Sequence, residues 1–130
     1  MKHLILIFWL LFTLSGCSDD DNDIEYRDEL LGTWKLVEEF GSSGGPGQWH
    51  KVKNGYTYTF DGSGNLITDR YSCKGTYQET VDEVTIEFDC PDSKYRVTAA
   101  VSFNNNHLIL TPDPGVYCDE GCATKFKRIK

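Results

Sequence analysis

The stretch CKGTYQETVDEVTIEFDC, residues 73–90, alternates apolar and polar side chains on both sides of a polar break. A period of two is typical of a strand that buries one face and exposes the other. If residues 80–83 form the turn of an antiparallel hairpin, Cys73 falls directly opposite Cys90. The same register sets two further pairs on the same face, Gly75 with Phe88 and Tyr77 with Ile86. This stretch therefore predicts a β-hairpin closed by a Cys73–Cys90 disulfide.

Short runs of the same kind fill the rest of the body of the chain, and no segment keeps a helical period for three turns. We expect strands at residues 33–40, 49–60 with a break at Asn54-Gly55, 65–71, 73–79, 84–90, 95–103, 107–111 and 123–129. Residues 61–64 (DGSG) and 104–106 (NNN) tolerate the positive φ that tight turns need. Eight strands in sequence predict an all-β fold, an antiparallel up-and-down barrel.

Two more cysteines of the body lie close together near its end. Pairing Cys73 with Cys90 leaves Cys118 to bridge Cys122 within one loop, which we expect in an oxidising compartment. The alternative is a metal site at Cys118-x-x-x-Cys122, with Asp119 and Glu120 between the two cysteines. No histidine lies near in sequence, so the disulfide is the preferred interpretation and we expect no metal or other cofactor.

The first seventeen residues predict a secretory signal. Lys2 and His3 precede an apolar run over residues 4–14, which is too short to span a bilayer as a mature helix. Residues 14–17 (LSGC) resemble the lipobox of bacterial lipoproteins, in which cleavage exposes a cysteine that is then acylated. The resemblance implies a signal peptide over residues 1–16 and a lipid anchor on Cys17; an ordinary secretion signal is the alternative.

Residues 17–29 are expected to form a flexible tether, because residues 18–23 (SDDDND) cannot bury apolar surface. The run also resembles the acidic tags that direct some lipoproteins to the cell surface, and a plain solvated spacer fits equally well. We expect the protein to be located at the bacterial outer membrane, to which its lipid anchor would attach it. The formal charge is -7, and it becomes -8 without residues 1–16, which disfavours nucleic acid as a partner.

The start of the predicted barrel carries a second resemblance. Gly32-Thr33-Trp34 resembles the Gly-x-Trp motif on the first strand of lipocalins, and 60–64 (FDGSG) adds to the likeness, which covers residues 30–130. The resemblance implies an eight-stranded barrel whose closed end is plugged by Trp34, with Arg128 of the last strand packed across the ring. This chain is shorter than most ligand-carrying lipocalins, so a filled interior is the alternative to a cavity.

The loops opposite the plug form the expected functional rim, because all four prolines and the predicted disulfides lie in or beside them. A ligand site there would use Trp49, with Tyr58, Phe88, Tyr95 and Val97 as cavity lining. The alternatives are rim packing for Trp49 and a packed core for the other four. The glycine-rich segment 41–47 is either a flap over the mouth or a plain connection.

The sequence does not predict an enzyme. His50 and His107 are expected at opposite ends of the barrel, no serine has a triad motif, and paired thiols leave no cysteine nucleophile, so we name no catalytic residue. Three hypotheses follow. The first is a lipocalin-like lipoprotein that binds a small apolar or amphiphilic ligand. The second is a module that presents its rim to a protein or glycan, as small barrel inhibitors of lysozyme do. The third is a structural surface lipoprotein.

Overall fold

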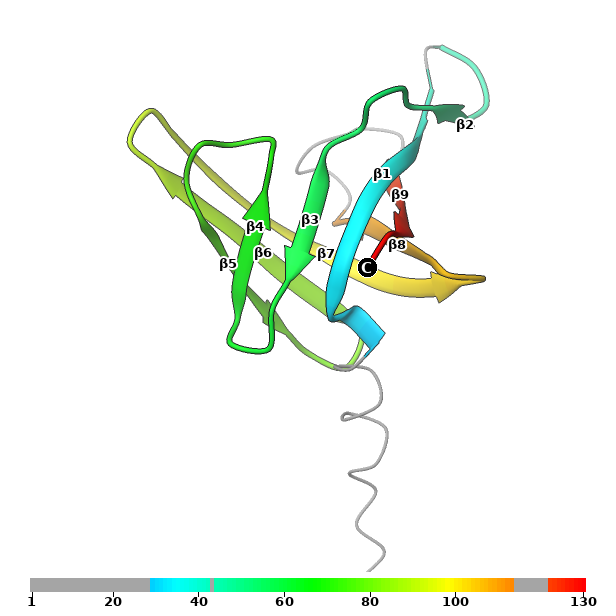
Figure 1. Ribbon diagram of the computed structural model, residues 1–130. Helices are drawn as coiled ribbons and strands as arrows, with labels where there is room; N and C mark the ends of the chain where they lie inside the picture. The colour runs from blue at the N-terminus through cyan, green and yellow to red at the C-terminus, as the bar shows by residue number, and fades with distance from the viewer. Residues whose placement is uncertain (1–28, 43, 114–121) are drawn as a thin grey trace, which may run out of the picture.

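A computed structural model describes residues 29–42, 44–113 and 122–130, which form a closed antiparallel β-barrel (Figure 1). The strands are β1 (Gly32–Gly41), β2 (Gln48–Lys51), β3 (Thr57–Phe60), β4 (Asn65–Thr68), β5 (Gly75–Glu79), β6 (Glu83–Cys90), β7 (Ser93–Asn104), β8 (His107–Pro112) and β9 (Ala123–Arg128). Consecutive strands from β3 to β9 are neighbours, and β9 returns to pair with β1. The all-β, up-and-down barrel predicted from the sequence is confirmed.

The nine strand segments occupy eight positions around the barrel. β3 pairs with the first half of β1 and β2 with the second half, both along the same edge. The interruption between them falls at Asn54, whose φ is 55°, and at Gly55, which packs against the backbone of Leu36. A side chain at position 55 would collide with that backbone. The predicted break at Asn54-Gly55 is therefore confirmed, and it divides one strand position into two segments.

The β5–β6 hairpin has the register expected from its alternating sequence. Gly75 pairs with Phe88 and Tyr77 with Ile86. Cys73 is bonded to Cys90, with Cα atoms 5.5 Å apart. The turn is closed by a 2.9 Å hydrogen bond from the Thr80 amide to the Glu83 carbonyl.

A β-bulge in β1 changes which side chains face the interior. Trp34 and Leu36 point inward, and Leu36 pairs with Phe126 of β9. The register then shifts, so that Glu38 pairs with Lys125 rather than with an inward residue. Because one extra residue reverses the alternation, Glu38 and Phe40 lie on the outer face.

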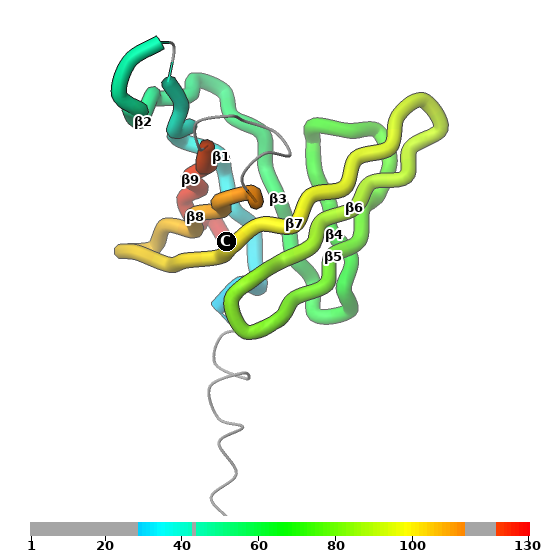
Figure 2. Tube along the Cα trace, turned by 180° about the vertical axis from the view of Figure 1, so that it is seen from behind, coloured from blue at the N-terminus to red at the C-terminus, as the bar shows by residue number. Residues whose placement is uncertain are grey.

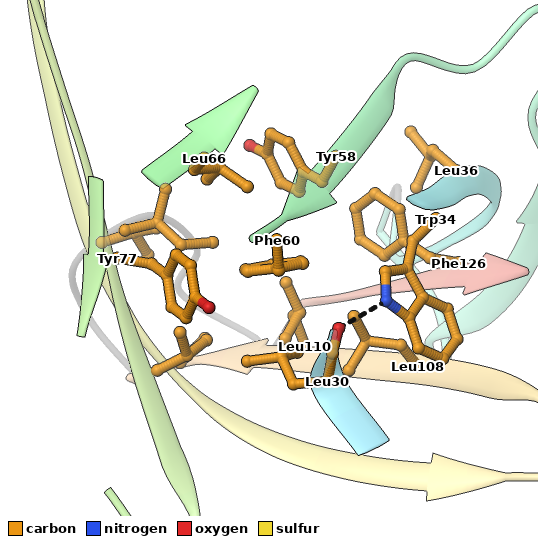
Figure 3. Close-up of a cluster of buried hydrophobic side chains, with 14 of the residues drawn as sticks. Leu30, Trp34, Leu36, Tyr58, Phe60, Leu66, Tyr77, Leu108, Leu110 and Phe126 are labelled. Carbon is orange, nitrogen blue, oxygen red and sulfur yellow. Dashed lines mark hydrogen bonds between the residues drawn. The ribbon is translucent and has the colours of Figure 1, made fainter. Parts of the chain in front are cut away.

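The barrel interior is filled by large apolar side chains from every strand position, as Figure 3 shows for part of the set. Trp34, Phe60, Phe88 and Phe126 are each at most 2% exposed. Aromatic rings meet edge-on or stacked, with Phe60 and Tyr77 4.9 Å apart and Tyr58 and Phe126 5.4 Å apart between centroids. Such contacts stabilise a core beyond simple area burial.

The end of the barrel at which β1 begins is closed by Trp34. Its indole nitrogen donates a 2.8 Å hydrogen bond to the carbonyl of Leu30, which is fully buried beneath it (Figure 3). The guanidinium carbon of Arg128 lies 4.2 Å from the centroid of the Trp34 ring. Gly32 has a φ of 121°, and a Cβ there would lie 2.5 Å from the Lys130 carbonyl oxygen. The structure thus brings together Gly32, Trp34 and Arg128, the three residues expected at the closed end.

The opposite end carries the connections β1–β2, β4–β5 and β6–β7. β4 and β5 are shorter than predicted, since β4 ends at Thr68 and β5 begins at Gly75. Asp69, which follows the last residue of β4, accepts a 2.7 Å hydrogen bond on its carboxylate from the Thr57 amide. Residues 69–74 therefore form a loop over this rim. The β6–β7 connection is instead a tight turn at Pro91 and Asp92.

Candidate functional site

The rim opposite Trp34 carries three tyrosines and one arginine that come together from separate elements. Tyr56 directly precedes β3, Arg70 and Tyr71 lie in the β4–β5 loop, and Tyr95 lies in β7. The three tyrosines are half-buried and pack against the core, whereas Arg70 is exposed. We call these four residues the rim cluster.

Arg70 is held above the tyrosine rings. Its guanidinium carbon lies 4.7 Å from the centroid of Tyr56 and 5.4 Å from that of Tyr71. Arg70 also acts on the neighbouring phenol, since it lowers the pKa of Tyr56 against the effect of burial. An arginine over an aromatic face is attracted by the ring quadrupole and keeps its remaining donors for a ligand. The rim thus presents a fixed positive charge beside apolar surface.

Burial further favours the protonated form of two hydroxyls at this site. Removal from water raises the pKa of Tyr56 and, more strongly, that of Tyr58. For Tyr56 the charge of Glu39 acts in the same direction, while Arg70 opposes it. Both phenols are protonated at neutral pH, as tyrosines ordinarily are, and the half-buried Tyr56 can donate a hydrogen bond at the rim. An anionic group at the rim would meet a guanidinium and neutral hydroxyl donors.

Three of the five residues expected to bind a ligand lie inside the barrel below the rim cluster, and a fourth, Tyr95, belongs to the cluster itself. Tyr58, Phe88 and Val97 are 2%, 1% and 7% exposed, and Tyr95 is half-buried. The rings of Tyr58 and Phe88 stack with centroids 6.2 Å apart, and Tyr95 lies 6.4 Å from Phe88. Because these side chains pack against one another, they form a floor under the mouth.

The Cys73–Cys90 disulfide stands beside the rim cluster. Cys73 follows Tyr71 by two residues, and Cys90 ends the strand that pairs with the start of β7. The ring of Tyr71 lies 4.9 Å from Phe88 and 6.0 Å from Tyr95. The disulfide ties the β4–β5 loop to the neighbouring hairpin and so restricts where Tyr71 can lie.

Trp49, the fifth expected ligand residue, lies elsewhere. It pairs with Phe40 on the outer face of the barrel, with ring centroids 5.4 Å apart. The Lys125 ammonium lies 4.1 Å from the centre of the indole. The structure therefore does not bring Trp49 to the mouth, because the bulge in β1 turns Phe40 and its partner outward.

Several expectations concern cysteines that the structure does not describe. Cys17, the expected lipidation site, and Cys118 lie outside the described residues. Cys122 is described and is disulfide-bonded. The pairing of Cys118 with Cys122 remains a prediction.

Residues 29–42, 44–113 and 122–130 contain no cluster of three or more histidine, cysteine or acidic side chains suited to a metal ion. His50 pairs with Glu39 near the rim, whereas His107 begins β8 beside the turn at the closed end. The two histidines thus lie near opposite ends of the barrel wall.

Arg70 and Tyr71 were not expected at the site from the sequence. Residues 65–71 read as one strand, which would have placed Arg70 and Tyr71 on opposite faces of the sheet. The available signal was that Arg70 and Tyr71 lie three and two residues before Cys73, in a connection at the rim. A disulfide next to exposed aromatic and basic residues indicates a held loop.

No protein-family model, curated protein or solved structure significantly matches this chain. The described part of the chain contains no helix with the length and apolar character needed to cross a bilayer.

Proposed function

We propose that the chain is a lipid-anchored, lipocalin-like lipoprotein of the bacterial outer membrane that binds a small amphiphilic molecule at its barrel mouth. The observation that carries the proposal is the position of Arg70 over Tyr56 and Tyr71 at the rim. A guanidinium beside half-buried rings suits a ligand with an anionic end and an apolar body. The protein acts by binding and is not an enzyme.

The anchoring part of the proposal rests on the sequence. An apolar run over residues 4–14 precedes the lipobox-like residues 14–17, and an acidic stretch follows. Two or more acyl chains would hold Cys17 firmly in a membrane. Glu29 enters the barrel at the closed end, where its carbonyl accepts a hydrogen bond from Arg128. This position supports a mouth that faces away from the anchor.

The packed interior limits what the ligand can be. Tyr58, Phe88 and Val97 are buried beneath the rim cluster, so an apolar body would lie across the rings of Tyr71 and Tyr95 instead of passing deep into the barrel. We therefore expect a small or flat apolar part. The anionic end would sit at Arg70 and the Tyr56 hydroxyl.

A comparison of decanoate with decanol tests this site, because the two probes differ only in the anionic group. The intact protein, purified with its disulfides, is titrated with each probe and binding is followed by calorimetry and by native mass spectrometry. We expect decanoate to bind about tenfold more tightly, since a hydrogen bond to a charged group contributes about 1.5–3 kcal/mol. Arg70→Gln should abolish this preference.

Arg96→Gln is the matched control, because Arg96 is an exposed arginine next to Tyr95 in the sequence that faces Glu87 on the outer side of the sheet. The control should bind both probes as the parent does. Equal binding of decanol and decanoate by the parent would contradict the role of Arg70. Failure of both probes to bind would contradict the carrier function.

The filled interior also favours a second candidate, a module that presents the rim to a protein or glycan. In that case the same exposed groups, Arg70 above all, would contact a macromolecular partner, and a basic protein would suit the charge of the chain. Capture of envelope or host proteins by the parent, lost in Arg70→Gln and kept in Arg96→Gln, would support it. Binding of decanoate without capture of any protein would not support this second candidate.

A further inference from the structure

The outer wall of the barrel carries rows of basic side chains across four strand segments. Lys35 of β1 lies directly opposite Lys127 of β9, and Lys127 lies directly opposite His107 of β8. In the next row Glu38 stands between Lys51 of β2 and Lys125 of β9. We call Lys35, Lys51, His107, Lys125 and Lys127 the basic wall.

Figures 1 and 2 show from opposite sides that β8, β9 and β1 lie side by side where the barrel closes. The basic wall therefore lies on one continuous surface. It contrasts with the formal charge of -7 for the whole chain. The protein as a whole is acidic, but this face of it is positively charged.

This arrangement is not neutralised by the described residues. Like charges directly opposite each other on a sheet destabilise the pairing. Glu38 is the one carboxylate within these rows of the described strands, and it is already bonded to Lys125. No carboxylate of the described residues forms an ion pair with Lys35 or Lys127. Lys35 and Lys127 can therefore pair with additional acidic groups.

Two hollows connect the wall to the place where the chain enters the barrel. One, of about 180 Å³, is lined by residues that include His107, Ile109 and Lys125. The other, of about 110 Å³, lies against Glu29 and Arg128. Both are lined by Asn104, Asn105 and His107, so they flank the β7–β8 turn. Their lining groups extend from Glu29 to the basic wall.

The chain itself supplies an acidic segment that ends near this position. Residues 19–23 (DDDND) contain four aspartates, and Asp23 precedes Glu29 by six residues. Six residues span up to about 20 Å, and the Glu29 carbonyl is bonded to Arg128, the residue that follows Lys127 in β9. A segment joined by so short a connection has an effective concentration on the order of millimolar at the wall.

We propose that the acidic segment 19–23 docks on the basic wall of its own molecule. Its aspartates would pair with Lys35 and Lys127 and relieve the repulsion between these two ammonium groups, beside the ring of His107. Docking leaves only residues 24–28 between the segment and the barrel. The anchored barrel would then sit close to the membrane on a shortened tether, with the side wall turned toward the anchor.

Lysine acetylation measures this contact in the full protein. The protein is extracted from membranes in a non-ionic detergent and treated with an acetylating ester, and the rate at each lysine is read by peptide mass spectrometry. We expect Lys35 and Lys127 to react about fivefold more slowly in the parent than in D19N/D20N/D21N/D23N, which corresponds to about 1 kcal/mol. At about 1 M salt, where the screening length is about 3 Å, this protection should disappear.

Lys74, which directly precedes β5, and Lys94 of β7 serve as internal controls, because both lie near the rim and outside the basic wall. The control variant D82N/D92N removes acids from two exposed turns and should leave all rates unchanged. Equal rates at Lys35 and Lys127 in the parent and the aspartate variant would overturn the proposal. Protection that is lost on dilution would also overturn it, because it would assign the contact to a second copy of the chain.

Discussion

The guanidinium carbon of Arg128 lies 4.2 Å from the centroid of the Trp34 ring, and the same side chain donates hydrogen bonds to the carbonyls of Glu29 and Leu31. One arginine thus holds both the indole and the backbone that enters the barrel. Trp34 in turn donates to Leu30. The closed end is a set of linked contacts around one aromatic ring.

Trp34→Ala should therefore lower the free energy of unfolding by about 3–5 kcal/mol, because the ring is 1% exposed and its removal leaves a cavity. Chemical denaturation checks this value. Trp49→Ala is the matched control, since Trp49 is 38% exposed on the outer wall and should cost about 1 kcal/mol. A Trp34→Ala protein that unfolds like the parent would contradict the importance of this contact.

Gly75→Ala should destabilise the barrel by about 1–3 kcal/mol through overpacking. A Cβ at position 75 would press into the Phe88 ring and lie 2.9 Å from the Glu87 carbonyl oxygen. Gly62→Ala is the control, because its added Cβ would meet nothing within 4 Å. Thermal unfolding of both variants, followed by circular dichroism, measures the difference. Equal melting temperatures would show that Phe88 moves aside without cost.

Replacing both Cys73 and Cys90 with serine should lower stability by about 2–4 kcal/mol, the usual effect of losing a native disulfide. The change also frees the β4–β5 loop, so decanoate binding should weaken together with stability. Denaturant titration and calorimetry on the same samples test both effects. A variant that keeps full affinity would show that Tyr71 is held by ring packing alone.

Asp61 should make stability depend on pH in the acidic range. Its carboxylate accepts hydrogen bonds from the amides of Asn65 and Ser63 and from the Asn65 side chain, and these bonds hold its pKa below the ordinary value. A pKa lowered by folding adds stability above the unfolded value, and that stability is lost as pH falls through the folded value. Asp61→Ala should therefore have a lower free energy of unfolding than the parent at neutral pH.

The difference between Asp61→Ala and the parent should shrink as pH falls below about 4. Urea unfolding at a series of pH values measures it. Asp92→Asn is the control, because Asp92 is an exposed aspartate in the β6–β7 turn. This variant should keep the difference in unfolding free energy from the parent constant across the series. A constant difference across the range would mean that Asp61 acts without its charge.

The hairpin of residues 73–90 could be predicted to the register because its information is local. The alternation of Val84, Ile86 and Phe88 assigns the faces, and a short turn allows one symmetric pairing. The break at Asn54-Gly55 could also be predicted from the sequence, because those residue types favour positive φ or close backbone approach. Short-range chemistry decided both features.

The position of Trp49 could not be predicted because it depends on the bulge in β1. An uninterrupted strand would point Phe40 inward with Trp34 and Leu36, and Trp49 would follow its partner to the mouth. The register shift between Leu36 and Glu38 reverses this outcome. No residue type in that part of the strand marks the extra residue, which lies where β1 pairs with β9.

Both limits of the described chain meet at the closed end, where the Thr33 amide bonds the Lys130 carbonyl at 3.0 Å and the Ile129 amide bonds the Thr33 carbonyl at 2.8 Å. A fluorophore or affinity tag fused after Lys130 would therefore stand behind the plug, away from Arg70 and the tyrosines. Molecules immobilised through such a tag on a sensor chip would all display the same open rim to the analyte. The fold is thus suited to oriented capture, in which every immobilised copy is competent to bind.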